Sequence, residues 1–123
     1  MTEAQRFPHL QLRVKFSPAD MFGPGKAELL ERIAATGSIS AAARQMRMSY
    51  KRAWQLTDAM NRYFRAPLVT AAAGGTRGGG AAVTPTGTRV LAAYRSLQRS
   101  ALTAAARDLA TMSRLAVRRP RKL

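Results

Sequence analysis

Side chains that suit contacts with DNA are concentrated in one seven-residue segment, Ser-Tyr-Lys-Arg-Ala-Trp-Gln, which begins at Ser49. Lys51 can donate to guanine O6 and N7, and Gln55 can pair with adenine N6 and N7. Ser49, Tyr50 and Arg52 are better suited to phosphates, which fix the register of a protein on DNA but carry little sequence information. We therefore expect this segment to open a helix whose N-terminal residues read base edges.

Two residues of the same predicted helix have more than one interpretation. Trp54 is either a groove contact or a core residue, and neither is favoured, because smaller side chains already form the buried face. Asp58 can accept a hydrogen bond from cytosine N4, or it can orient Lys51 or Arg62. For the whole polar face, a solvated charged helix is the alternative to DNA contact.

Catalytic and metal-binding patterns are missing from the sequence. The chain has no cysteine, and His9 is its one histidine. The six acidic residues are scattered, without an HExxH motif, a carboxylate pair or a Ser-His-Asp set. The glycine-rich run at 74–80 lacks the Lys-Ser or Lys-Thr pair of a nucleotide-binding loop. We expect no enzymatic activity, no cofactor and no metal site.

The charge of the chain indicates a polyanionic partner. Lys and Arg total 21 against six acidic residues, a formal net charge of +15, and 17 of the 21 are Arg, which pairs with phosphate better than Lys does. Nucleic acid is the first candidate partner, and an anionic membrane surface or an acidic protein comes next. Charge alone does not separate DNA from RNA.

The N-terminal part of the chain is predicted to contain a strand and a helix. Leu, Leu, Val and Phe alternate with polar residues, which predicts a half-buried strand over 9–16. Residues 17–25 contain two prolines and two glycines and are predicted to form a loop. A helix is predicted over 26–36, with Gly37 as its C-terminal stop.

Two further helices are predicted in quick succession. Ser40 can cap a short helix over 41–46, and Ser49 can cap a longer helix that ends near Phe64. The few residues between them predict a helix-turn-helix.

The glycine-rich run lies between two predicted strands, at 68–73 and 81–84. The run suits a hairpin tip, and Arg77 within it can approach the minor groove or phosphates. An ordinary flexible hairpin is the alternative.

A long helix is predicted at the end of the chain. Thr84 can cap it, with Pro85 at its first position, and it would extend to about Val117, or roughly 45 Å. Its distal half would be exposed in a monomer, so a two-fold partner helix is expected to cover it, although the stripe could also pack on its own domain. The candidate dimerisation residues recur at spacings of three or four: Leu91, Tyr94, Leu97, Ala101, Ala105, Leu109 and Met112.

The predicted fold is mainly α with a small β-sheet, a winged helix-turn-helix followed by a long C-terminal dimerisation helix. The expected division is a DNA-binding domain over 1–84, the dimerisation helix over 85–117 and a basic tail over 118–123. No apolar run is long enough to span a membrane, so we expect a cytoplasmic, nucleoid-associated protein.

Three motifs carry a resemblance to a known family: Gly-Ser-Ile-Ser at 37–40, Ser-Tyr-Lys-Arg-Ala-Trp at 49–54 and Gly-Gly-Thr-Arg-Gly-Gly-Gly at 74–80. Together they resemble the N-terminal DNA-binding domain of the ModE family of molybdate-responsive transcriptional regulators. The resemblance spans about residues 8–115, with a more distant similarity to the LysR-type head domain. It implies a winged helix-turn-helix that dimerises through its last helix and binds an inverted repeat.

The resemblance also implies which residues face DNA: Ser49, Tyr50, Lys51, Trp54 and Arg77. Ser38 and Ser40, at the start of the preceding helix, complete the candidate DNA contacts together with Arg52 and Gln55. Family members with an oxyanion sensor carry C-terminal molybdate-binding domains, and nothing in this sequence matches that sensor. We therefore expect no molybdate binding by this chain, and the sequence identifies no other effector.

These observations favour a bacterial sequence-specific transcriptional regulator that binds double-stranded DNA as a homodimer, and molybdenum-related genes are its candidate targets. The alternative is a nonspecific architectural protein of the nucleoid type, which explains the charge equally well. It predicts affinity carried by phosphates, a steep salt dependence and almost no sequence preference.

Overall fold

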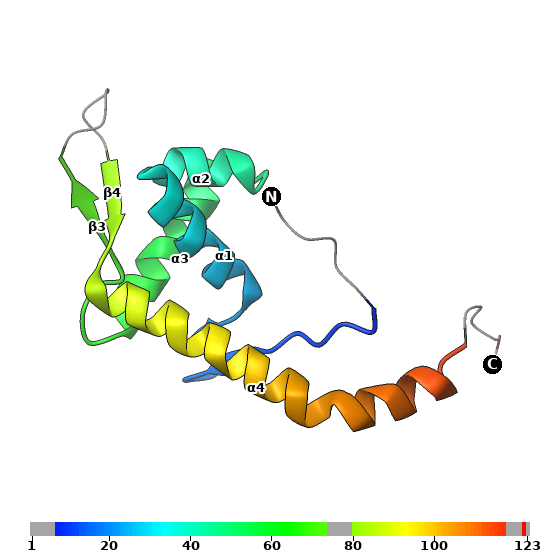
Figure 1. Cartoon of the computed structure of the whole chain (residues 1–123). Helices are drawn as coiled ribbons and strands as arrows, with labels where there is room; N and C mark the ends of the chain where they lie inside the picture. The colour runs from blue at the N-terminus through cyan, green and yellow to red at the C-terminus, as the bar shows by residue number, and fades with distance from the viewer. Residues whose placement is uncertain (1–6, 74–79, 118–121, 123) are drawn as a thin grey trace.

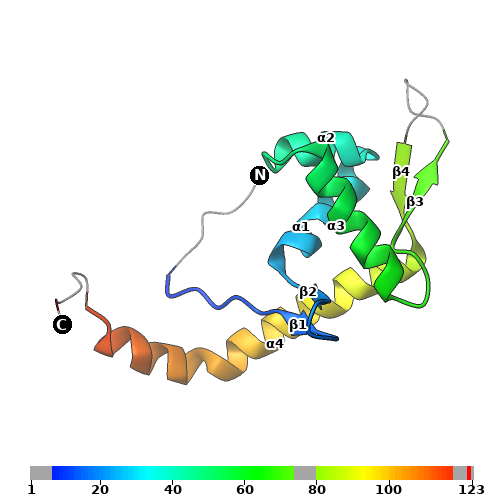
Figure 2. The ribbon, with the colours of Figure 1, turned by 180° about the vertical axis from the view of Figure 1, so that it is seen from behind.

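The computed structural model describes residues 7–73, 80–117 and 122. Within these ranges, four helices and two small antiparallel sheets follow one another (Figures 1 and 2). Their order is β1 (Val14–Lys15), β2 (Met21–Phe22), α1 (Pro24–Thr36), α2 (Ile39–Gln45), α3 (Tyr50–Tyr63), β3 (Val69–Ala72), β4 (Gly80–Val83) and α4 (Pro85–Leu115). The predicted winged helix-turn-helix with a long last helix is confirmed.

Helix α1 starts at Pro24, two residues earlier than predicted, because proline suits the first position of a helix, where no N–H bond is needed. It ends as predicted at Gly37. This glycine has a left-handed φ of 69°, and its N–H donates to the Ile33 carbonyl at 2.8 Å.

The caps of the next two helices were predicted with different success. Ser49 caps α3 as expected, and its Oγ accepts from the Arg52 N–H at 3.0 Å. The prediction that Ser40 caps α2 is wrong, because Ser38 Oγ accepts from the Ala41 N–H at 3.0 Å. Helix α2 therefore begins at Ile39, whose side chain packs against the core, and Ser40 lies exposed in the first turn.

The predicted strand over 9–16 is much shorter in the structure. Only Val14 and Lys15 pair, with Phe22 and Met21, so a hairpin occupies part of the region predicted as loop. Residues 9–13 have no strand partner among the residues described, and they run beside α4, where Tyr94 Oη donates to the Leu12 carbonyl at 2.6 Å. The predicted alternation of burial is present up to Val14.

The second hairpin is the predicted wing. Strands β3 and β4 pair in register from Val69 opposite Val83 to Ala72 opposite Gly80. The tip with Arg77 lies outside the described residues. Thr84 caps α4 as predicted, since its Oγ1 accepts from the Gly87 N–H at 3.0 Å.

The core lies where α1, α2 and α3 meet the base of the wing and the first half of α4. Its largest fully buried side chains are Phe22, Leu29, Leu30, Ile33, Met60 and Leu68. Gly87 lets α4 approach the start of the wing, because a Cβ there would lie 2.4 Å from the Leu68 carbonyl oxygen.

The second half of α4 extends away from the other elements in both views of the chain (Figures 1 and 2). In the described ranges, no helix has the length and apolar content needed to cross a bilayer.

Candidate nucleic-acid interface

A tight turn sets α3 against α2. Arg47 adopts a left-handed φ of 57°, which is uncommon for a residue other than glycine, and the Met48 N–H donates to the Ala43 carbonyl at 3.0 Å. Ala43 and Ala53 are buried where the two helices pack, and their small side chains allow close approach. The pair has the arrangement of a helix-turn-helix, with α3 as its second helix.

Helix α3 separates a buried face from an exposed one, as predicted. Ala53, Thr57 and Met60 are buried. Lys51 and Gln55 are exposed on the other side, near the N-terminal end of the helix. The two predicted base-reading residues are therefore next to each other and open to a ligand.

The two open interpretations on this helix are resolved in part. Trp54 is 49% exposed, so its placement in the core is wrong. Asp58 forms an ion pair with Arg62, with Nε and Oδ2 3.2 Å apart, which confirms that the acid orients a neighbouring cation. Whether Asp58 also meets a base stays a prediction.

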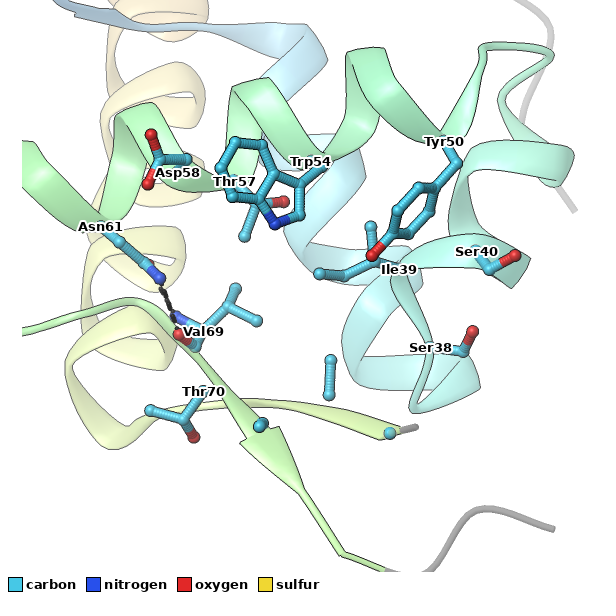
Figure 3. A pocket seen from close by; sticks show the side chains of 13 residues that line it. Ser38, Ile39, Ser40, Tyr50, Trp54, Thr57, Asp58, Asn61, Val69 and Thr70 are labelled. Atoms are coloured by element: carbon cyan, nitrogen blue, oxygen red, sulfur yellow. Dashed lines mark hydrogen bonds between the residues drawn. The ribbon is translucent and has the colours of Figure 1, made fainter. Parts of the chain in front are cut away.

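An open cleft of about 690 Å³ lies between α3 and the wing (Figure 3). The side chains of Tyr50 and Trp54 enter it from α3. The start of α2 and the two strands form its other walls. Its lining residues are Ser38, Ile39, Ser40, Tyr50, Trp54, Thr57, Asp58, Asn61, Val69, Thr70, Ala71, Gly80 and Ala81.

Asn61 fixes the wing to α3. Its Oδ1 accepts from the N–H groups of Leu68 and Val69 at 2.9 and 3.0 Å, and its Nδ2 donates to the Val69 carbonyl at 2.8 Å. No structural role was predicted for Asn61 from the sequence. Its role could have been predicted from its position, because it is an amide at the border between the buried and polar faces of α3 and lies shortly before a strand.

The other strand of the wing is held as well. The Ala81 N–H donates to the Gly37 carbonyl at 2.9 Å, which joins β4 to the turn between α1 and α2. Both strands are thus tied to the helices that carry the candidate DNA contacts, and the cleft has fixed walls.

Positive charge surrounds the turn between α2 and α3. Arg44, Arg47, Lys51 and Arg52 are all exposed there. Within the described part of the chain, the ion pairs are Glu28 with Arg32, Asp58 with Arg62 and Glu31 with Arg95, so none of them neutralises these four cations. Such a surface attracts a polyanion.

Lys26, unlike the four exposed cations at the α2–α3 turn, has a structural role. Its Nζ donates to the Met21 carbonyl at 2.6 Å and so joins α1 to β2. Burial lowers the pKa of Lys26 from its ordinary value, Asp20 opposes this shift, and Arg52 adds to it.

The predicted DNA contacts are only partly brought together. Ser38 and Ser40 line the cleft, with Ser38 engaged as a helix cap and Ser40 exposed. Ser49 is also a cap, and Arg52 is exposed in the first turn of α3. Arg77 lies outside the described residues, so its wing contact stays a prediction.

The predicted dimerisation residues divide between the two halves of α4. Tyr94 is only 3% exposed and Leu91 packs against the core, so we leave both out of the proposed dimer contact. Farther along, Leu97 and Met112 are exposed. Ala101, Ala105 and Leu109 are half-buried on the same side of the helix.

Known proteins match this chain over the helix-turn-helix. The sequence pattern of the family described as "Bacterial regulatory helix-turn-helix protein, lysR family" matches residues 25–88. That match runs from the start of α1 to the start of α4 and covers just over half of the 123 residues.

Relatives with described roles share the same region. The molybdenum-pterin-binding protein MopB of Rhodobacter capsulatus is 51% identical over 76 residues, which are 62% of this chain and 28% of the relative. The transcriptional regulator ModE of Haemophilus influenzae is 38% identical over 89 residues, 72% of this chain and 35% of the relative. The DNA-binding transcriptional dual regulator ModE of Escherichia coli K12 is 42% identical over 71 residues, 58% and 27% respectively.

The chain thus spans between about a quarter and a third of the length of these relatives. Their similarity to it agrees with the resemblance carried by the three sequence motifs. The family pattern, the tight turn and the exposed second helix identify the same element. The chain belongs to the lysR family of bacterial regulatory helix-turn-helix proteins.

Proposed function

We propose that this protein is a sequence-specific, DNA-binding transcriptional regulator that places α3 in the major groove. The observation that carries the proposal is the exposure of Lys51 and Gln55 side by side near the N-terminal end of α3, within a helix-turn-helix. Side chains at this end of such a helix reach base edges. Two of the relatives named above are described as transcriptional regulators, which supports the same function.

The wing is proposed to contact DNA beside the helix. Its strands are hydrogen-bonded to α3 through Asn61 and to the α1–α2 turn through Ala81, so it has a fixed position relative to Lys51. Arg77 is the residue proposed to reach the minor groove or the phosphates.

The protein is further proposed to act as a homodimer on an inverted repeat. Helix α4 has 31 residues, or about 46 Å at 1.5 Å per residue, and its second half leaves the domain (Figure 2). Leu102 and Met112 are exposed there, 54% and 68% respectively. A partner's α4 would cover this surface and would set two α3 helices one or two DNA turns apart.

The regulated genes are proposed to be related to molybdenum. The support is similarity to relatives described as a molybdenum-pterin-binding protein and as molybdenum transport protein ModE. The proposal concerns the target genes and assigns no molybdate site to this chain.

A binding selection from fragmented genomic DNA, at low and at physiological salt, tests the proposed function. Recovery of a short inverted repeat that survives the higher salt supports it. The architectural alternative is the second candidate, because it explains the charge of +15 equally well. Recovery of unrelated fragments that are lost as salt rises would support that alternative and overturn the regulator.

A further inference from the structure

We propose that Trp54, assisted by Tyr50, recognises the 5-methyl group of thymine in the major groove. The inference rests on the proposed function, because it assumes that α3 binds DNA. It adds a class of base to the specificity that Lys51 and Gln55 would provide.

The two rings lie where a ligand can reach them. Trp54 and Tyr50 are one helical turn apart on the wing side of α3, and they are 49% and 56% exposed. Figure 3 shows both side chains extending into the cleft rather than back into the helix bundle. Among the described residues, neither ring forms an aromatic pair or a side-chain hydrogen bond. Two large side chains therefore present apolar surface to solvent beside the predicted base-reading row.

Apolar and polar side chains both line the cleft beside the two rings. Ile39, Val69 and Ala81 contribute apolar side chains that are buried or half-buried. Thr57 is a buried polar residue of the lining, and Ser40 and Thr70 are polar and exposed. In the major groove, every base edge presents hydrogen-bonding atoms, and the methyl group on thymine C5 is the apolar one. An apolar side chain on a major-groove helix thus has one base-specific partner, the thymine methyl.

The charges around the cleft fit this position on DNA. Lys51 and Arg52 precede Trp54 on α3 and are exposed, and Arg52, which is predicted to contact phosphate, can help to hold the helix in the groove. A deoxyribose is the other apolar part of DNA that the rings could touch. Contact with the sugar would give equal affinity for thymine and uracil, whereas contact with the methyl group would favour thymine. Comparing the two bases therefore separates these two contacts.

Deoxyuridine differs from thymidine by the methyl group alone, and it provides the test. Two random-sequence duplex pools of the same design are amplified, one with dTTP and one with dUTP, and the dissociation constant of each is measured at physiological salt. The strongest sequence from the genomic selection is then synthesised with single thymines replaced by deoxyuridine. Wild type, Trp54→Ala, Trp54→Phe and the matched control Gln55→Ala are compared after circular dichroism has shown that each is folded.

Wild type is expected to bind the thymine pool more tightly than the uracil pool. One or two positions per half-site should show a loss of about fourfold on methyl removal, which is the effect of burying one methyl group. Gln55→Ala should keep this loss. Trp54→Ala should abolish this loss, because without the indole ring its affinities for thymine-containing and uracil-containing DNA should be equal. Trp54→Phe should keep part of the difference.

The outcomes separate this inference from the function on which it rests. A uniform weakening of both pools by Trp54→Ala, with wild type indifferent to the methyl group, would overturn thymine recognition and indicate a sugar or packing contact. That result leaves a selected inverted repeat, and thus the regulator, intact. Failure to recover any preferred sequence would overturn the regulator, while the two pools would still decide whether Trp54 senses the methyl group.

Discussion

Asn61 holds both backbone polar groups of Val69. Its Oδ1 accepts from the Val69 N–H at 3.0 Å and its Nδ2 donates to the Val69 carbonyl at 2.8 Å (Figure 3). One side chain of the second helix of the helix-turn-helix therefore fixes the first residue of the wing. We conclude that the wing and α3 form one unit.

Replacement of Asn61 by Ala is expected to lower the free energy of unfolding by about 1–3 kcal/mol, because the N–H groups of Leu68 and Val69 lose their acceptor. Urea unfolding measures the change. The matched control is Gln55→Ala, an exposed polar residue on the same helix, which should alter stability by less than about 0.5 kcal/mol. Equal stability of the two variants would show that the Asn61 bonds do not hold the wing.

Replacement of Lys51 by Ala is expected to relax base preference. Loss of its contact to guanine should reduce the ratio of specific to nonspecific affinity by roughly tenfold, equivalent to about 1.4 kcal/mol. Arg44→Ala is the control, since Arg44 is exposed on α2 and should affect phosphate contact alone. Quantitative binding to the selected sequence and to a scrambled duplex gives both ratios. A parallel loss of affinity for both duplexes in the Lys51 variant would remove Lys51 from base reading.

Stability is expected to fall at alkaline pH through Tyr94. Burial raises the pKa of its phenol above 10.0, and Arg95 opposes the shift. The unfolded chain thus loses this proton at lower pH than the folded chain does. The stabilisation is complete below about pH 10 and is lost as pH rises through the raised pKa.

Urea unfolding of wild type and Tyr94→Phe at several pH values above 9 measures this contribution. The variant keeps the ring that packs on Phe22 but loses the hydrogen bond to Leu12. Wild type should be more stable by about 1 kcal/mol at neutral pH, and this advantage should shrink above pH 10. Tyr50→Phe, at an exposed position, should change neither quantity. An advantage independent of pH would mean that Tyr94 does not titrate in this range.

A charge on the side of α4 that carries Leu97, Ala101 and Ala105 is expected to separate the proposed dimer. Ala105→Glu places a carboxylate on the side of α4 shared by Leu97 and Ala101. Thr103→Glu adds the same charge on the opposite side and is the matched control. Sedimentation equilibrium should show a monomer for Ala105→Glu and a dimer for wild type and Thr103→Glu. A dimer in all three proteins would place the dimer contact elsewhere.

The parts of the fold that depend on local chemistry could be predicted from the sequence. Ser49, Thr84 and Gly37 end or begin helices through bonds to residues at most four positions away, and each was placed correctly. Ser38 and Ser40 are equally good caps, and the packing of Ile39 against the core decides between them.

Features that depend on distant contacts could not be predicted. Strand β2 lies in a segment rich in Pro and Gly, and Phe22 is buried there because it packs against Tyr94, far along the chain. The position of Trp54 was open for the same reason, since the wing that forms the other wall of its cleft is paired with α3 through Asn61. The net charge could be calculated from the composition, but the structure was needed to show that four exposed cations surround the α2–α3 turn.

The most direct test of the central claim is the ratio of two dissociation constants at physiological salt, one for the selected inverted repeat and one for a scrambled duplex of equal length. A sequence-specific regulator should bind the selected duplex at least about 10³-fold more tightly, with two chains on each duplex. A ratio near one, with both affinities falling steeply as salt rises, would contradict the account and indicate a protein that binds DNA through its phosphates alone.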